Sequence, residues 1–132
     1  MPAARAPLDF LWFVPSAGDN KYLSHPETDR APTPAYLRDI ALAADRLGYY
    51  GVLLPTGAHC ADSWITAASL ASQTERLKFL VASRPGLIAP AESVRQAAAL
   101  DRISKGRVLL NIVTGGSTPQ PSADGLFLDH RE

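Results

Sequence analysis

The sequence predicts an α/β fold built around a parallel β-sheet, and two observations carry this prediction. Short apolar runs alternate along the chain with longer segments whose apolar residues recur at helical spacing. The order is strand, helix, strand, helix, strand, helix, strand, with no other internal repeat. Alternating units of this length are typical of a parallel sheet whose strands are joined by right-handed crossovers.

The first strand is expected over residues 8–14 and the first helix over residues 34–47. Thr33 can cap this helix, Pro34 suits its first position because proline has no N–H to leave unpaired, and Gly48 ends it. Its apolar residues recur at helical spacing and are expected to face the core: Leu37, Ile40, Ala41, Ala44 and Leu47.

The second strand is expected over residues 52–54, and Asp62 or Ser63 caps the helix that follows and runs to about Gln73. The expected core residues of this second helix are Ile65, Ala68 and Leu70. A third strand over residues 78–82 and a third helix over residues 90–104 complete the alternation before the last strand.

The segment from residue 99 to residue 116 reads as a helix end, a tight stop, a strand and a loop. Basic residues near position 105 favour a helix C-terminus, and Gly106 suits the left-handed position just past it. Residues 108–113 form an apolar run interrupted only by Asn111, which predicts a strand covered on both faces. Thr114 then opens a loop. A polar Asn near such a strand end is a candidate site residue.

Composition narrows the classes of function. The 132 residues carry no formal net charge, which argues against a nucleic-acid partner because no basic excess is present. No apolar run approaches the roughly 18 residues of a membrane span, and the first ten residues lack the apolar segment of a secretory signal. The single cysteine excludes an internal disulfide. We therefore expect a cytoplasmic protein.

Two architectures fit the alternation: an open doubly wound sheet and a (β/α)8 barrel. A dinucleotide site in the first architecture requires G-x-G-x-x-G after the first strand, and the sequence there, PSAGDN, lacks this fingerprint. In either architecture the carboxyl ends of parallel strands meet at one edge. Residues 14–16, 55–60, 82–84 and 113–116 are therefore expected to share one pocket rim.

Several stretches resemble the flavin-dependent, luciferase-like monooxygenases, and most closely the alkanesulfonate monooxygenase branch. The pattern Leu-Asp-x-x-Ser-x-Gly-Arg at residues 100–107 and Asn-x-Val-Thr-Gly at residues 111–115 carry this resemblance. Five further stretches agree with it: FLWFVP at 10–15, AADRLG at 43–48, VLLPTG at 52–57, RLKFLVASRP at 76–85 and DGLFLDH at 124–130. The resemblance implies the barrel.

A complete barrel needs about 250 residues. The 132 residues supply four strands and three helices, so we expect residues 1–132 to be one partial domain, the N-terminal half of a (β/α)8 barrel from a longer enzyme. The fourth strand would then be an open edge. The alternative is a self-sufficient small α/β domain, because about 130 residues is an ordinary domain size.

The resemblance implies flavin contacts for some residues. Cys60 matches a cysteine beside the reduced flavin, where a thiol is a weak hydrogen-bond donor; a buried, inert cysteine is the alternative. One histidine, His59, and one cysteine do not make a metal site. Asn111 and Thr114 match positions facing the isoalloxazine ring; the alternatives for Asn111 are a buried amide bonded to backbone and a residue that only shapes the barrel mouth.

Other residues are expected to support the flavin or to bind substrate. Ser83 is expected to support the flavin at the end of the third strand, through a cis peptide bond between Ala82 and Ser83. Arg84 either attracts a sulfonate or phosphate or lies on the surface. Trp12 either walls the substrate cleft or belongs to the barrel core.

The activity implied by the resemblance is desulfonation dependent on reduced FMN, expected of the full-length enzyme and not of the isolated 132 residues. A separate NAD(P)H-dependent flavin reductase supplies FMNH2, and O2 and an organosulfonate are converted to an aldehyde and sulfite. A homo-oligomer is expected. Two alternatives remain: another luciferase-like flavin or deazaflavin oxidoreductase, and a non-catalytic half-barrel that acts as a pairing chain.

Overall fold

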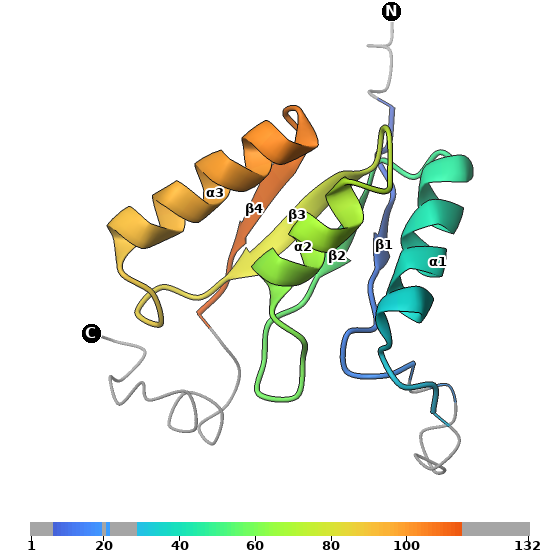
Figure 1. Ribbon diagram of the computed structural model, residues 1–132, viewed down its shortest axis with the longest axis horizontal. Helices are drawn as coiled ribbons and strands as arrows, with labels where there is room; N and C mark the ends of the chain where they lie inside the picture. Colours follow the sequence, from blue (N-terminus) through green and yellow to red (C-terminus); the bar gives the residue numbers. More distant parts are fainter. Residues whose placement is uncertain (1–6, 20, 22–28, 115–132) are drawn as a thin grey trace, which may run out of the picture.

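A computed structural model describes residues 7–19, 21 and 29–114 of the chain. Strands and helices alternate along it (Figure 1). The elements are β1 (Leu11–Phe13), α1 (Pro34–Arg46), β2 (Gly51–Leu54), α2 (Ser63–Ala71), β3 (Lys78–Ser83), α3 (Pro90–Ser104) and β4 (Val108–Ile112).

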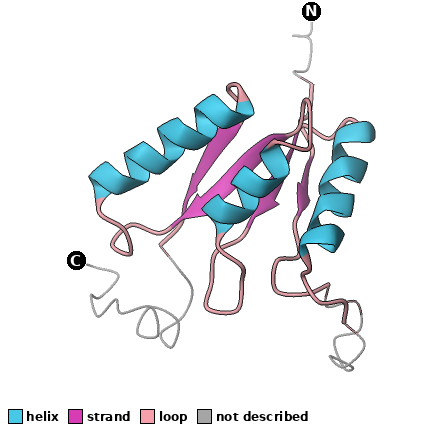
Figure 2. Ribbon diagram, in the orientation of Figure 1, coloured by secondary structure: helices cyan, strands magenta, loops and turns pink. Residues whose placement is uncertain are grey.

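The four strands form one parallel sheet in the order β1-β2-β3-β4, and the three helices lie on one face of it (Figure 2). Each strand pairs with the next strand in the sequence, so β1 and β4 are the two edges. This arrangement confirms the α/β prediction and matches part of a (β/α)8 barrel, in which each helix returns the chain to a parallel strand.

The register divides the strand residues between two faces of the sheet. One row runs through Trp12, Val52, Phe79 and Val108, and the neighbouring row runs through Phe13, Leu53, Leu80 and Leu109. Side chains alternate along each strand, so the first row faces the helices and the second faces away from them. We call these the helix face and the open face.

The core lies between the helix face and the three helices. Val52, Leu54, Phe79 and Val81 of the inner strands are fully buried there. The helices contribute buried side chains of α1, α2 and α3: Leu37, Ala41, Ala44, Trp64, Ala67, Leu70, Ala71 and Leu100.

Side-chain caps start the first two helices, as the sequence predicts. The Thr33 hydroxyl accepts a 3.2 Å hydrogen bond from the Tyr36 N–H, and the Asp62 carboxylate accepts one of 2.8 Å from the Ile65 N–H. Each cap satisfies an N–H group that has no partner inside the helix. The choice between Asp62 and Ser63 as the cap of α2 is therefore settled in favour of Asp62.

Two backbone positions need their particular residues. A Cβ on Gly51 would lie 2.8 Å from the carbonyl oxygen of Lys78, so only glycine lets β2 start this close to β3. At the end of α3 the left-handed position belongs to Lys105 (φ 58°), and Gly106 follows with φ 82°. Gly106 was expected to take the left-handed position just past the helix, and it does have a positive φ; the structure adds Lys105 as a second left-handed residue before it.

Arg107 joins α2 to the starts of β3 and β4. Its guanidinium donates to the carbonyl oxygens of Ala71 (2.7 Å), Leu77 (2.9 Å) and Ser104 (2.6 Å) and to the Thr74 hydroxyl (3.0 Å). The sequence indicated only a basic residue near a helix C-terminus. Two of these acceptors, the carbonyls of Ala71 and Ser104, belong to the last residues of α2 and α3. The last carbonyls of a helix have no partner inside it, so the Arg107 cation is well placed at both helix ends.

Four expectations about burial and length are wrong. Leu47 and Ile65 are 70% and 73% exposed, because the chain turns away at Gly48 and α2 presents Trp64 to the core in place of Ile65. β4 is not covered on both faces, since it is an edge strand that α3 covers only in part. The strand expected over residues 8–14 is regular only at Leu11–Phe13, where it pairs with β2.

Candidate functional site

A pocket of about 460 Å3 lies at the carboxyl ends of β2, β3 and β4. It is lined by the last residues of these strands and the first residues of the loops after them: Leu53, Pro55, Thr56, Ala82, Asn111, Ile112, Val113 and Thr114. The position agrees in part with the expected shared rim: residues from 55–60, 82–84 and 113–116 line the pocket, but none of residues 14–16 does. We call it the rim pocket.

Asn111 is the polar side chain that β4 contributes to the rim pocket. It is half-buried, stands in register with Ala82 of β3, and lies on the open face of the sheet. The hydrogen bond of 3.0 Å from the Val113 N–H to the Ser83 carbonyl continues the ladder one residue past β4. This ladder holds the Asn111 backbone in place. Its amide offers both a donor and an acceptor to the pocket.

Two hydroxyl groups accompany the amide. Thr114 follows β4 and is exposed at the pocket mouth, and Thr56 comes from the loop after β2. Thr114 was expected as a site residue, whereas Thr56 was expected only as one of residues 55–60 at the rim and was not singled out. Its signal was available, since Thr56 is the first polar residue after the buried strand β2 and therefore falls at the same edge of the sheet.

Cys60 lies in the loop between β2 and α2 and is not among the residues that line the rim pocket. Its N–H donates to the Gly57 carbonyl (3.0 Å), and the N–H of Ala61 donates to the Ser16 carbonyl (3.1 Å). The loop is thus fastened to the end of β1, and Cys60 is half-buried in it as a free thiol while His59 is exposed. The structure does not bring Cys60 into contact with Asn111.

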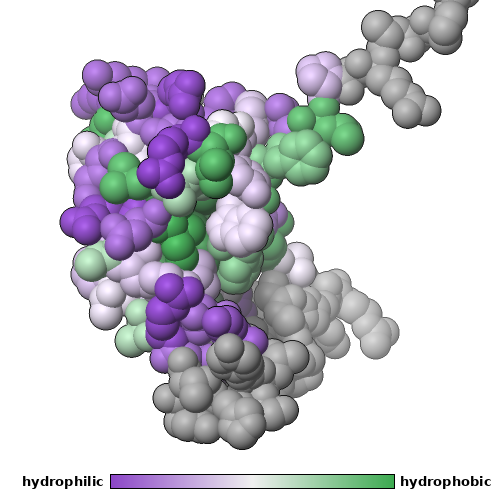
Figure 3. All heavy atoms as spheres, turned by 90° about the vertical axis from the view of Figure 1, so that its right-hand side faces the viewer, coloured by the Kyte–Doolittle hydropathy of each residue, from purple (hydrophilic) through white to green (hydrophobic). Residues whose placement is uncertain are grey.

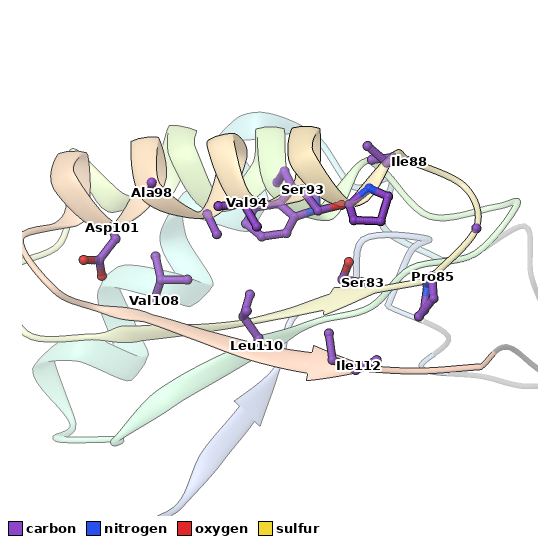
Figure 4. Close-up of a pocket in the computed structure, with 14 residues that line it drawn as sticks. Ser83, Pro85, Ile88, Ser93, Val94, Ala98, Asp101, Val108, Leu110 and Ile112 are labelled. Atoms are coloured by element: carbon purple, nitrogen blue, oxygen red, sulfur yellow. The ribbon is translucent and has the colours of Figure 1, made fainter.

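Ser83 and Trp12 lie on the helix face, away from the rim pocket. Ser83 stands in register with Ile112, and both side chains point toward α3 (Figure 4). Trp12 packs against α1, with its ring 5.7 Å from the ring of Tyr49 in an edge-to-face arrangement. Ser83 and Trp12 therefore do not line the rim pocket with Asn111, because each side chain lies on the helix face and that of Asn111 lies on the open face.

The bond between Ala82 and Ser83 is trans, as are all peptide bonds of the described residues, so the predicted cis bond is wrong. A trans bond is the ordinary state because the cis form of a non-proline bond costs about 3 kcal/mol. Arg84, the next residue, is only 6% exposed. This burial excludes the alternative of an exposed surface arginine.

The described residues contain no group of three or more histidine, cysteine or acidic residues placed to hold a metal ion. Within the same part of the chain, no helix is long and apolar enough to cross a membrane.

The fold and the rim pocket together define part of a parallel α/β barrel with a candidate site at the carboxyl ends of its strands. The family model of the luciferase-like monooxygenases matches residues 8–132. The chain therefore belongs to the luciferase-like monooxygenase family.

Solved structures agree with this fold. EDTA monooxygenase from Chelativorans sp. BNC1 superposes with a TM-score of 0.74 at 16% identity, over 91% of this chain and 33% of that one. A riboflavin lyase, solved with modified FMN and riboflavin, gives a TM-score of 0.74 at 25% identity, over 92% of this chain and 33% of the lyase. A third structure is the oxygenating constituent of 3,6-diketocamphane monooxygenase from the CAM plasmid of Pseudomonas putida, solved with FMN. Its TM-score is 0.65 at 20% identity, over 90% of this chain and 32% of that one. The chain thus spans about a third of each of these proteins.

Proposed function

We propose that the chain forms part of the flavin site of an alkanesulfonate-type monooxygenase that uses reduced FMN. The observation that carries the proposal is the position of Asn111, whose amide lies in a pocket at the carboxyl ends of three parallel strands. Membership of the luciferase-like family supports it, as do the modified FMN in the riboflavin lyase structure and the FMN in the diketocamphane monooxygenase structure. The alkanesulfonate assignment rests on the resemblance of the sequence motifs.

The rim pocket fits the ring of a flavin better than its phosphate. Leu53, Pro55 and Ala82 give it an apolar wall, on which a planar heterocycle can pack. The amide of Asn111 and the hydroxyls of Thr56 and Thr114 can meet the donor and acceptor groups along a ring edge. No cationic residue lines it, whereas phosphate binding in barrels commonly uses the loops after the seventh and eighth strands.

When bound, reduced FMN supplies two electrons to O2, so that one oxygen atom enters the substrate and the other leaves as water. An alkanesulfonate would yield an aldehyde and sulfite. In this chain Asn111 would orient the ring edge, and the apolar wall would exclude water from the reacting atoms. Cys60 and Ser83 remain proposed flavin contacts, and Arg84 and Trp12 remain proposed substrate contacts. A separate NAD(P)H-dependent reductase would supply the reduced flavin.

Anaerobic calorimetry with reduced FMN tests the flavin site. We expect Asn111→Leu to weaken the affinity at least tenfold, because an amide bonded to the ring contributes about 1.4 kcal/mol or more. The matched control is Gln73→Leu, which also replaces an amide by leucine but at an exposed position after α2 that does not line the rim pocket. Equal affinity of Asn111→Leu and wild type, or no binding by wild type, would overturn the assignment.

Sulfite release tests the substrate class. The enzyme that carries these residues within a complete barrel is incubated in air with an NAD(P)H-dependent flavin reductase, FMN and an alkanesulfonate, and sulfite and aldehyde are quantified. Formation of both in equal amounts supports the alkanesulfonate assignment. Flavin binding without sulfite release would overturn it and would leave the broader luciferase-like oxidoreductase, acting on another class of substrate.

A further inference from the structure

Strand β2 (Gly51–Leu54) leaves the sheet directly after Leu54, and the next residue explains why. In the register with β1, the carbonyl of Val14 faces the position where residue 55 would donate its N–H. Pro55 has no N–H group, so this pairing cannot continue. The Val14 carbonyl accepts the N–H of Ser16 instead, at 2.8 Å. The sheet therefore opens on the β1 side of β2 at Pro55.

On the β3 side of β2, the ladder ends one residue later. Alternate residues of a parallel strand bond to the same neighbour, and the Leu53 carbonyl bonds to β1, so Leu54 and then Thr56 face β3. The register directs the Thr56 N–H to the carbonyl of Ala82, but that carbonyl accepts the hydroxyl of Ser63 at 2.9 Å. The Thr56 N–H is thus left without a hydrogen-bond partner among the residues that the structure describes.

This unpaired N–H group belongs to a residue of the rim pocket. Thr56 lines the pocket and is half-buried, as is Asn111. A backbone N–H group shielded from water costs free energy unless it finds an acceptor. The side-chain amide of Asn111 likewise makes no hydrogen bond within the described part of the chain. Both groups are therefore available to a ligand.

The rim pocket differs from two larger hollows of the described residues in having a side-chain amide beside a free N–H. The groove of about 600 Å3 between α3 and the sheet is lined mostly by apolar side chains, and Figure 4 shows Val94, Leu110 and Ile112 along it. On the α1 side, hydrophobic surface continues out to the first described residues (Figure 3), and the Asp19 carboxylate in the hollow there already bonds to Arg30. A ligand edge with several hydrogen-bonding atoms therefore suits the rim pocket best.

We propose that the Thr56 N–H donates a hydrogen bond to one of the two carbonyl oxygens of the flavin ring. This contact rests on the proposed function, since it belongs to the same flavin site. No cationic side chain lines the rim pocket, so the N–H is matched to a neutral carbonyl of the ring rather than to the phosphate. The divergence of β2 from β3 after Leu54 is what leaves this donor free.

The polar edge of the flavin ring carries an N–H group between two carbonyl oxygens. A side-chain amide has one acceptor and two donors, so Asn111 can accept from this N–H group and donate to one carbonyl at the same time. The other carbonyl then needs a second donor, and the Thr56 N–H supplies one whose direction is set by the backbone. Because a donor that is already in place needs no reorganisation, the Thr56 N–H would fix which way the ring edge faces.

Two substitutions separate the N–H of Thr56 from its hydroxyl. Thr56→Val keeps the N–H and the shape but loses the hydroxyl, whereas Thr56→Pro loses both groups. Proline suits the sign of φ here, because Lys105 is the only non-glycine residue with a positive φ among those described. In the enzyme that carries these residues within a complete barrel, anaerobic calorimetry is expected to show that Thr56→Pro binds reduced FMN at least tenfold more weakly than Thr56→Val. Circular dichroism verifies that both variants are folded.

Amide hydrogen exchange, followed by NMR, tests the contact in the same enzyme without any substitution. The Thr56 N–H is expected to exchange at least tenfold more slowly when reduced FMN saturates the site. The Ala35 N–H is the reference: it lies in the first turn of α1, outside the rim pocket, and also has no partner among the described residues. Infrared spectra of reduced FMN, isotopically labelled at its ring carbonyls, identify the acceptor. Because a hydrogen bond weakens the C=O bond, the stretching frequency of one carbonyl is expected to be higher in Thr56→Pro than in Thr56→Val.

The outcomes separate this contact from the flavin site as a whole. Equal affinity of folded Thr56→Pro and Thr56→Val, unchanged exchange of the Thr56 N–H on binding, or unchanged carbonyl stretches would each refute the contact. If Thr56→Pro does not fold, the exchange measurement on the wild type decides alone. When the wild type binds reduced FMN and Asn111→Leu weakens binding, such a result removes the Thr56 N–H and leaves the Asn111 site in place. A wild type that does not bind reduced FMN refutes the proposed function, and the Thr56 contact with it.

Discussion

Ser63 donates a hydrogen bond of 2.9 Å from its hydroxyl to the carbonyl oxygen of Ala82, and this bond joins the first turn of α2 to the end of β3. Both residues are nearly fully buried, at 4% and 5% exposed. Ala82 stands in register with Asn111 and lines the rim pocket beside it. A helix on one face of the sheet thus fixes the position of a peptide group next to the candidate site on the other.

Ser63→Ala is expected to lower the free energy of unfolding by about 1–3 kcal/mol, because it leaves the buried Ala82 carbonyl without this partner. Urea denaturation followed by circular dichroism measures the change. Ser69→Ala is the control: its hydroxyl bonds only to the Thr66 carbonyl of its own helix, and it is exposed. Equal stability of the two variants would show that the Ser63 bond contributes nothing specific.

Arg107→Met is expected to destabilise the protein by about 3 kcal/mol or more. Four oxygen acceptors, from α2, the start of β3 and α3, lose a charged donor together, and bonds to charged groups contribute more than neutral ones. Arg102→Met, in the last turn of α3 and exposed, is expected to cost less than about 1 kcal/mol. Thermal unfolding of the two variants side by side makes the comparison, and a cost of Arg107→Met no larger than that of Arg102→Met contradicts the role assigned here.

The helices and strands were predictable because their signals are local. Thr33 and Asp62 cap helices through bonds that span three residues, and the apolar run at β3 needs no knowledge of the rest of the chain. The bonds of Arg107 to Leu77 and Ala71 span 30 and 36 positions of sequence, and no local pattern shows them. The same applies to Ser83, whose face is decided by the register with β4.

The sequence of helix α2 does not show which of its faces is buried. Its residues SWITAASLA are apolar almost all round, so two stripes compete: Ile65 with Ala68, and Trp64 with Ala67 and Ala71. The larger ring of Trp64 takes the core position, which Ile65 was expected to share. The edge on which the rim pocket lies was predictable from the ends of the strands, whereas the structure was needed to show which of residues 55–60 line it: Pro55 and Thr56 do, and Cys60 does not.

The exposure of Ile65 gives a direct test. Ile65→Ala is expected to change the free energy of unfolding by less than about 0.5 kcal/mol, since 73% of this residue is already in water. Leu70→Ala, five positions further along the same helix and 1% exposed, is expected to cost about 2–5 kcal/mol through lost burial and the cavity left behind. Chemical denaturation of both variants decides the point. A large cost at Ile65 would mean that this face of α2 is covered in solution.

The pair of Asp19 and Arg30 makes stability depend on pH at the loop between β1 and α1. The Arg30 side chain and backbone N–H donate to the two carboxylate oxygens at 2.8 and 3.0 Å, and these bonds hold the pKa of Asp19 below its ordinary value of 3.8. A depressed carboxyl pKa stabilises the folded state above the unfolded pKa, and this contribution disappears as the pH falls through the folded one. We expect Asp19→Asn to be less stable than wild type at neutral pH, with the difference shrinking below about pH 4.

Unfolding curves measured from neutral to acidic pH test this expectation, and Asp39→Asn serves as the control. Asp39 also contacts an arginine, Arg38, but both side chains are largely exposed, at 66% and 46%, so the pair is screened by solvent. Asp19, in contrast, is 8% exposed at its side chain. A difference between Asp19→Asn and wild type that persists unchanged at acidic pH would show that the carboxylate's charge is not what joins Asp19 to Arg30.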